Sequence, residues 1–155
     1  MIVSTRDAQW LSKTNEAVRL QGYAVVTDLL SADFCAKARD HMYAAKEKIE
    51  REIGVDRVAR SGELGVVRLP LKYEPFFVEF LNLPALHGIL DEVLAPTSIL
   101  HTQNGLILPS ASRDESGVFQ KSFHRDFPRF MNGYRASISV LFTSLIDSVI
   151  NGVVS

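Results

Sequence analysis

Apolar and polar residues in the first part of the chain follow a helical period, interrupted by one extended segment. Residues 7–21 place their apolar side chains on one side, which predicts a short amphipathic helix that ends at Gly22. Residues 23–27 combine β-branched and aromatic side chains between Gly22 and Asp28, which predicts a strand. A helix followed by a strand is therefore expected at the start of the chain.

A longer helix is predicted to begin after Ser31, whose hydroxyl suits the N-cap position. Its apolar residues recur every three or four positions and form one stripe, which comprises Phe34, Ala38, Met42, Ala45, Ile49 and Ile53. The charged residues between them predict a solvated face. His41 lies beside that face and is predicted to be structural or solvent-exposed.

Shorter elements are predicted next. Residues 54–65 have the composition of a loop, and residues 64–69 form a short candidate strand that ends at Pro70. A further helix is expected from Pro84, because proline is favoured in the first turn and apolar residues follow at helical spacing. His87 falls on the surface of that helix.

The second part of the chain is predicted to be mainly strands, over residues 98–108, 118–123 and 135–146. Polar residues 101–105 interrupt the first of these strands. A buried polar side chain needs a partner, which a bound ligand can provide, but a turn at Asn104-Gly105 explains the interruption equally well. Helices followed by strands predict an α+β fold with a β-sandwich or barrel in its second half.

Composition narrows the function classes. The chain has 155 residues, enough for one domain with a core, and a net charge of −1, which suggests neither nucleic acid nor a membrane surface as partner. The single cysteine, Cys35, excludes an internal disulfide and is predicted to be a buried structural thiol. No apolar run is long enough to span a membrane, and the N-terminus lacks a signal peptide. We therefore expect a soluble, cytoplasmic protein.

The candidate chemistry lies in His124-Arg125-Asp126, directly after a predicted strand. Residues two apart in a strand point to the same side, so the imidazole of His124 and the carboxylate of Asp126 are expected to lie side by side. These groups are two of the three ligands in the facial triad of non-haem Fe(II) oxygenases. The alternative interpretation of such a short motif is a pair of surface polar residues near a turn.

With these segments in their order, the chain resembles the phytanoyl-CoA dioxygenase family of Fe(II)/2-oxoglutarate-dependent oxygenases. The likeness covers nearly the whole chain and is carried by residues 22–39, 83–94, 119–127 and 138–147. It implies a single domain over residues 1–155, the N-terminal part of a phytanoyl-CoA dioxygenase-like domain. The implied fold has N-terminal helices packed on an incomplete double-stranded β-helix, which is a jelly-roll or cupin-like architecture.

The resemblance also implies a site. His124 and Asp126 become ligands of Fe(II), 2-oxoglutarate is the co-substrate, and O2 and a small organic substrate or acyl thioester are the reactants. Gln103 and Asn104 lie on the strand that contacts the co-substrate in the family, and Thr143 is expected to face the cavity. In the family, these groups support hydroxylation of an unactivated C–H bond.

The chain departs from the family after Asp147. The family usually continues to a distal histidine and a 2-oxoglutarate-binding arginine, whereas no histidine follows His124 here. The resemblance thus implies a C-terminally truncated member, and we expect these 155 residues alone to turn over poorly or not at all. Two other classes remain open: a non-catalytic β-sandwich binding module that has lost the metal site, and a cupin-like isomerase or metal-binding protein without an oxo-acid co-substrate.

Overall fold

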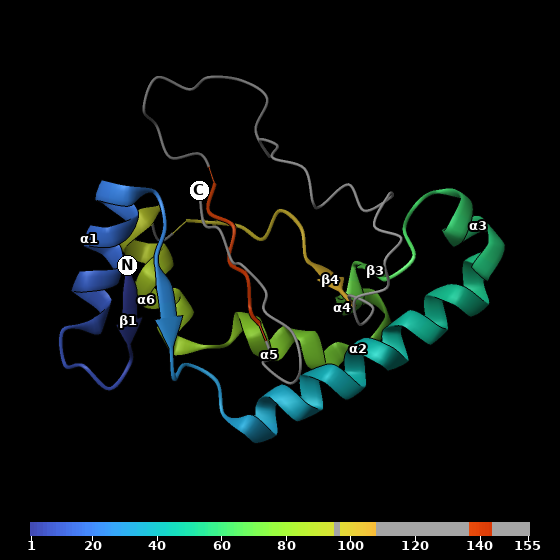
Figure 1. Cartoon of the computed structure of the whole chain (residues 1–155), viewed down its shortest axis with the longest axis horizontal. Coiled ribbons are helices and arrows are strands. Elements are labelled where there is room, and N and C mark those ends of the chain that lie inside the picture. The colour runs from blue at the N-terminus through green and yellow to red at the C-terminus, as the bar shows by residue number, and fades with distance from the viewer. Residues whose placement is uncertain (95–96, 108–136, 144–155) are drawn as a thin grey trace, which may run out of the picture. The chain divides into compact units, whose positions relative to one another are not determined.

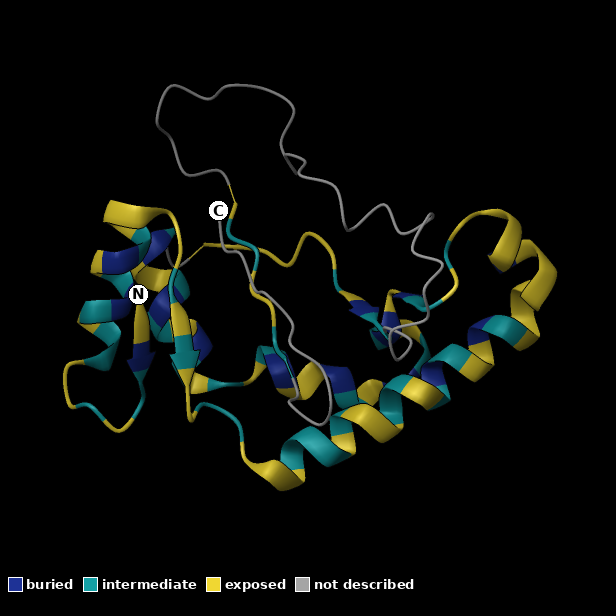
Figure 2. Ribbon diagram, viewed as in Figure 1, coloured by how far each residue is buried: buried dark blue, intermediate teal, exposed yellow. Residues whose placement is uncertain are grey.

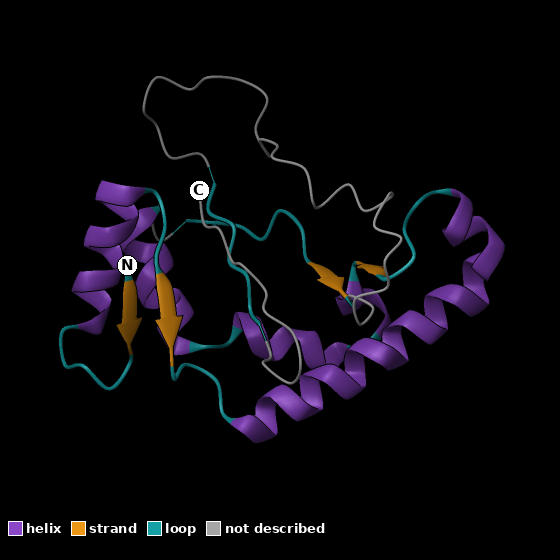
Figure 3. Ribbon diagram, viewed as in Figure 1, coloured by secondary structure: helices purple, strands orange, loops and turns teal. Residues whose placement is uncertain are grey.

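A computed structural model describes residues 1–94, 97–107 and 137–143 (Figure 1). The chain divides into two compact units. The first contains Met1–Cys35, Glu79–Ile99 and Met131–Ser155, and the second contains Ala36–Val78 and Leu100–Phe130. Helices and short strands occur in both units (Figure 3), so the predicted α+β class is confirmed.

The first unit holds a two-stranded parallel sheet of β1 (Ile2–Ser4) and β2 (Val25–Thr27). Helix α1 (Trp10–Gln21) connects the strands and ends where the sequence predicts. At its end Gly22 has φ 81°, a left-handed conformation that glycine adopts without steric cost, and its N–H donates to the Val18 carbonyl at 3.1 Å.

Helix α6 (Pro84–Val93) packs against α1 in the same unit. Leu86, Ile89 and Val93 are buried, which confirms the predicted core face, and His87 is exposed as expected. Gly88 lets the helices approach closely, because a Cβ there would lie 3.2 Å from Cδ2 of Leu11. Small residues at a helix crossing thus set the spacing between the two axes.

Helix α2 (Ala32–Ile53) is the longest helix of the described residues. The Ser31 hydroxyl accepts a hydrogen bond from the Phe34 N–H at 3.1 Å, so the predicted N-cap is confirmed. Ala45 and Ile49 are buried as the stripe predicts, whereas Ile53 is 42% exposed. The apolar stripe therefore ends one turn before the helix does.

The second unit contains several short elements after α2. They are α3 (Val55–Arg60), β3 (Val66–Arg68), α4 (Pro70–Tyr73), the 3-10 helix η1 (Pro75–Phe77) and β4 (Asn104–Leu106); α5 (Val78–Leu81) leads back to the first unit. The loop predicted over residues 54–65 is wrong, because α3 occupies Val55–Arg60. Gly54, with φ 94°, turns the chain, and the new helix then buries Val58.

Of the strands predicted in the second half, residues 118–123 lie outside the described residues, and so do residues 108, 135–136 and 144–146 of the other two. The described parts of those two strands agree with the prediction only at β4. Residues 101–103 and 137–143 have no regular secondary structure, and the described strand between 98 and 108 is reduced to β4. Strands form only where a partner supplies the ladder hydrogen bonds. The described residues form two small sheets and no double-stranded β-helix. Among residues 1–94, 97–107 and 137–143, no helix has the length and apolar character needed to cross a bilayer.

Candidate functional site

The predicted metal ligands His124 and Asp126 lie outside the described residues, so their side-by-side arrangement stays a prediction. Within residues 1–94, 97–107 and 137–143, no three His, Cys, Asp or Glu side chains gather closely enough to hold a metal ion. The described part of the candidate site is therefore the strand pair β3–β4, which carries the predicted co-substrate contacts Gln103 and Asn104.

The register of β3–β4 determines which side chains share a face. The strands are antiparallel, with Val67 opposite Gly105 and Arg68 opposite Asn104. The ladder continues past β4, because the Leu69 N–H donates to the Gln103 carbonyl at 3.1 Å. Side chains alternate along a strand, so Gln103 and Asn104 point to opposite faces of this small sheet.

One face of β3–β4 packs on the helices of the second unit. Val67 is fully buried, and a Cβ on Gly105 would lie 2.2 Å from Sδ of Met42 on α2. Gln103 lies on this face, and its Nε2 donates to the Phe77 carbonyl at 3.1 Å. Its Oε1 is buried without a hydrogen-bond partner among the described residues. Gln103 thus holds β4 against η1 and retains one free acceptor.

The other face of β3–β4 carries the half-buried pair Val66 and Leu106 and the exposed pair Arg68 and Asn104. Asn104 is exposed, and Arg68 lies next to it in the ladder with a side chain that is 55% exposed. The Nε of Arg68 donates to Glu63 Oε1 at 2.8 Å, and Nη2 donates to the same oxygen. This hydrogen-bonded guanidinium holds the pKa of Glu63 below its usual value. We call Arg68 and Asn104 the polar pair.

The polar pair has the chemistry of an anion contact. A guanidinium has five N–H donors in a fixed plane, and Glu63 accepts one from Nε and one from Nη2. The remaining donors, with the Asn104 amide beside them, suit a carboxylate. From sequence, Arg68 has two interpretations, a residue that faces a site and a surface arginine, and the surface role is favoured. The signal that was missing is the strand register, which places it beside Asn104.

Thr143 is half-buried in the first unit. Its neighbour Phe142 packs on Phe80 with ring centroids 4.8 Å apart, and Phe80 also contacts Phe34 edge to face at 5.0 Å. These aromatic contacts anchor the described residues 137–143. The expectation that Thr143 faces a cavity stays a prediction.

A charged cluster joins His41 and Lys48 of α2 to Glu74, and no pattern in the sequence predicted it. His41 Nδ1 lies 2.7 Å from Glu74 Oε2, and the His41 ring stacks on Phe76 at a centroid distance of 4.5 Å. Lys48 donates to the other Glu74 oxygen. Lys48 first, and then His41, lower the pKa of Glu74, which is only 8% exposed. His41 is structural as predicted, and its carboxylate partner, distant in sequence, ties α2 to the turn before η1.

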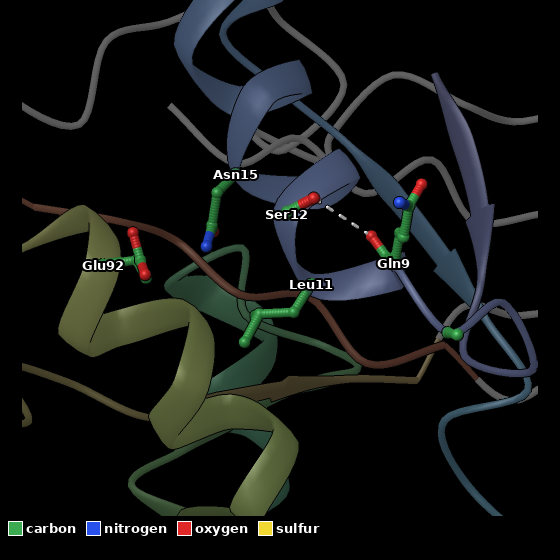
Figure 4. A pocket seen from close by; sticks show the side chains of 6 residues that line it. Gln9, Leu11, Ser12, Asn15 and Glu92 are labelled. Carbon is green, nitrogen blue, oxygen red and sulfur yellow. Dashed lines mark hydrogen bonds between the residues drawn. The ribbon is translucent and has the colours of Figure 1, made fainter.

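A hollow of about 440 Å³ lies on the first unit, between the start of α1 and α6. Figure 4 shows Asn15 and Leu11 of α1 pointing toward α6, which carries Glu92. The Ser12 hydroxyl donates to the Gln9 carbonyl at 3.4 Å, and Asn15 Oδ1 is buried without a described partner. The lining of this hollow combines the Glu92 carboxylate with neutral polar groups and Leu11. The hollow therefore favours neither an anionic nor a cationic ligand.

Comparison with known proteins gives two relatives and one family. The chain is 49% identical over 133 residues to the uncharacterized protein Rv1501 of Mycobacterium tuberculosis (strain ATCC 25618 / H37Rv) and to the uncharacterized protein Mb1539 of Mycobacterium bovis. This match covers 85% of the chain and 49% of each relative, so the chain spans about half the length of these relatives. No solved structure matches. Residues 18–147 match the phytanoyl-CoA dioxygenase (PhyH) family, and the chain therefore belongs to that family.

Proposed function

We propose that this chain carries the metal-binding part of an Fe(II)/2-oxoglutarate-dependent dioxygenase that hydroxylates a small organic substrate or acyl thioester. Membership of the phytanoyl-CoA dioxygenase family supports oxygenase chemistry in general. The observation that carries the finer proposal is that the matched residues 18–147 include His124 and Asp126. An imidazole and a carboxylate two residues apart are ligands that suit non-haem Fe(II).

The proposed roles follow from the donor and acceptor groups of each side chain. His124 and Asp126 would hold the iron, which, with 2-oxoglutarate and O2, supplies the oxidising chemistry of the site. Asn104 and Arg68 would orient a carboxylate of the co-substrate through N–H donors. Glu63 keeps the guanidinium of Arg68 in one orientation through two hydrogen bonds.

Gln103 is less suited than Asn104 to a carboxylate contact. Its amide nitrogen already donates to the Phe77 carbonyl, and its free Oε1 accepts hydrogen bonds. A carboxylate has no proton to donate to that oxygen. Of the two co-substrate contacts expected from sequence, Asn104 is therefore the one we retain as a direct contact, and Gln103 becomes a residue that positions β4.

Titration with Mn(II), a redox-silent substitute for Fe(II), tests the proposal by calorimetry with and without 2-oxoglutarate. The wild-type chain should bind Mn(II) more tightly when 2-oxoglutarate is present. His124→Ala and Asp126→Ala should each weaken binding at least tenfold, because each removes a ligand. His87→Ala, which removes an exposed histidine on α6, is the matched control and should bind as the wild type does.

Two results would redirect the proposal. Metal binding that 2-oxoglutarate leaves unchanged would favour a cupin-like metal protein without an oxo-acid co-substrate. No metal binding by a chain extended to the length of the mycobacterial relatives would favour a non-catalytic binding module. Succinate release is the activity readout, and we expect it to be robust in the extended chain and abolished there by His124→Ala.

A further inference from the structure

The thioether of Met42 on α2 lies directly against β4. A Cβ placed on Gly105, the central residue of β4, would lie 2.2 Å from Sδ of Met42 and 2.4 Å from its Cε. A glycine inside a strand often marks a place where another group approaches the backbone closely. Here the thioether fills the space that a side chain at position 105 would need, and α2 thereby holds the middle of β4.

Met42 stands at the margin of the core of the second unit. Ala45 and Ile49, one and two turns later on α2, are buried, whereas Met42 is half-buried (Figure 2). Val67, the ladder partner of Gly105, is fully buried. A half-buried methionine can be reached by a small solute and still contributes to packing. Met42 therefore combines access from solvent with a contact that β4 needs.

We propose that Met42 is a site of reversible oxidation by a hydroperoxide, and that its sulfoxide releases β4 from α2. With hydrogen peroxide, Sδ attacks one oxygen, so that an S–O bond forms while the O–O bond breaks. The sulfur loses two electrons, and the peroxide is reduced. The attacked oxygen passes its proton to the departing oxygen, which leaves as water. Methionine sulfoxide reductases reverse the oxidation.

Oxidation changes what this contact can accommodate. A thioether is apolar, whereas a sulfoxide oxygen is an acceptor that needs a donor when it is buried. Gln103 lies on the same face of the sheet, and its Nε2 already donates to the Phe77 carbonyl. The distances at Gly105 also leave no room for a further atom between Sδ and the strand. The oxidised side chain is therefore expected to leave this face, and β4 loses a packing contact.

Loss of that contact reaches the polar pair. Asn104 precedes Gly105 in β4, and the β3–β4 ladder places it opposite Arg68. A two-stranded sheet is marginal without packing against a further element. Oxidation of Met42 therefore weakens the pairing that keeps Asn104 beside Arg68. The inference is independent of the metal chemistry, because it uses only the packing of the second unit.

The other methionines provide internal controls, since the chain has three. Met1 is 41% exposed and belongs to the first unit, so its oxidation should leave β4 unchanged. Met131 lies outside the described residues. Met42→Leu retains both of these methionines and Cys35, and leucine nearly conserves the volume of methionine. An effect of oxidation at any other side chain would therefore persist in Met42→Leu.

Hydrogen exchange of the full 155-residue chain, before and after treatment with hydrogen peroxide, tests the proposal. Peptide mapping by mass spectrometry measures the oxidised fraction at Met42. Exchange at residues 104–106 should become at least tenfold faster in the oxidised wild type, and methionine sulfoxide reductases should restore the original rate. Met42→Leu should keep slow exchange after the same treatment. Met42→Gln, which puts a polar side chain at this position, should exchange faster without peroxide.

Three outcomes would overturn the proposal. In the first, Met42 stays reduced under conditions that oxidise Met1 completely. In the second, Met42 is oxidised and exchange at residues 104–106 is unchanged. In the third, peroxide accelerates exchange in Met42→Leu as much as in the wild type, which would assign the effect to another side chain. Met42→Ile is a second oxidation-resistant variant if Met42→Leu does not fold.

Discussion

The chain contains two short sheets, and only one of them carries a charged side chain on its open face. In the first unit, parallel β1–β2 presents Ile2 and Val25 on its open face. In the second unit, antiparallel β3–β4 presents Arg68 and Asn104 on its open face. Both sheets have two strands of three residues, so size does not distinguish them. The side chains on their open faces do. Ile2 and Val25 share their face with the uncharged Ser4 and Thr27, whereas the β3–β4 face adds Arg68 and Asn104, whose spare N–H donors suit a small anion.

The largest loss of folding stability is expected at Gly65, where the chain before β3 lies very close to the chain after β4. A Cβ on Gly65 would lie 2.4 Å from the Ile107 carbonyl oxygen, and Gly65 has φ 85°. Gly65→Ala must therefore move backbone and adopt a strained conformation, and we expect a loss of about 2–3 kcal/mol in the free energy of unfolding.

Gly22→Ala is the matched control in the first unit. Gly22 has a similar φ of 81°, but a Cβ there would meet nothing within 4 Å. Only the backbone term remains, and we expect a loss of about 1 kcal/mol. Urea unfolding measures both variants, and equal losses would show that β3–β4 lacks the close approach described.

The next effect concerns the buried Glu74. Lys48 and His41 lower its pKa, so the unfolded state binds more protons than the folded state between the folded pKa and the ordinary value of about 4.3. The stabilisation is present above the unfolded pKa and is lost as the pH falls through the folded pKa. Glu74→Gln should cost about 1–2 kcal/mol at pH 7, because charged hydrogen bonds are lost, and it should flatten the stability profile below pH 5.

Glu52→Gln tests whether burial causes that effect. Glu52 also pairs with a lysine, Lys72, but its side chain is 53% exposed. We expect a much smaller change in both stability and pH profile, since exposed pairs are screened by water. Chemical unfolding between pH 3 and pH 7 compares the two variants, and equal profiles would contradict a special role for the Glu74 cluster.

The smallest expected effect on stability comes from the polar pair. Arg68→Gln removes an exposed ion pair with Glu63 and should change the free energy of unfolding by about 0.5 kcal/mol or less. It should nevertheless weaken 2-oxoglutarate binding several-fold in the presence of Mn(II). Arg6→Gln, which breaks the exposed pair with Asp28 in the first unit, should leave that binding unchanged. Equal 2-oxoglutarate affinities in both variants would remove Arg68 from the proposed site.

Local signals predicted much of the helical part of this fold. Ser31, Gly22 and Pro84 mark helix ends through capping, a left-handed φ and a fixed proline φ, and all three act at the ends expected from sequence. Helix α3 was missed, because the composition of residues 54–65 suggests a loop while the burial of Val58 stabilises a helical turn. Tertiary burial overrides weak local preference in such a short segment.

The candidate site was harder to predict than the helices. Asn104 could be singled out because it interrupts an apolar segment. That Asn104 and Gln103 point to opposite faces of the sheet, with Asn104 on the exposed side, follows only from the β3–β4 register. Pairing between residues far apart in the chain also brings Glu74 to His41 and Lys48. No periodicity along one segment reports such contacts. The metal motif is the reverse case, because His124 and Asp126 are neighbours in sequence and their role was inferred from spacing and family resemblance.

We propose that His124 and Asp126 hold an iron ion that 2-oxoglutarate chelates. Anaerobic addition of Fe(II) and 2-oxoglutarate tests it directly, because a chelated 2-oxo acid gives Fe(II) a visible charge-transfer band. We predict that band for the chain extended to the length of its mycobacterial relatives, and its loss in the double variant His124→Ala/Asp126→Ala. A band of equal intensity in the double variant, or no band in the extended wild-type chain, would contradict the claim.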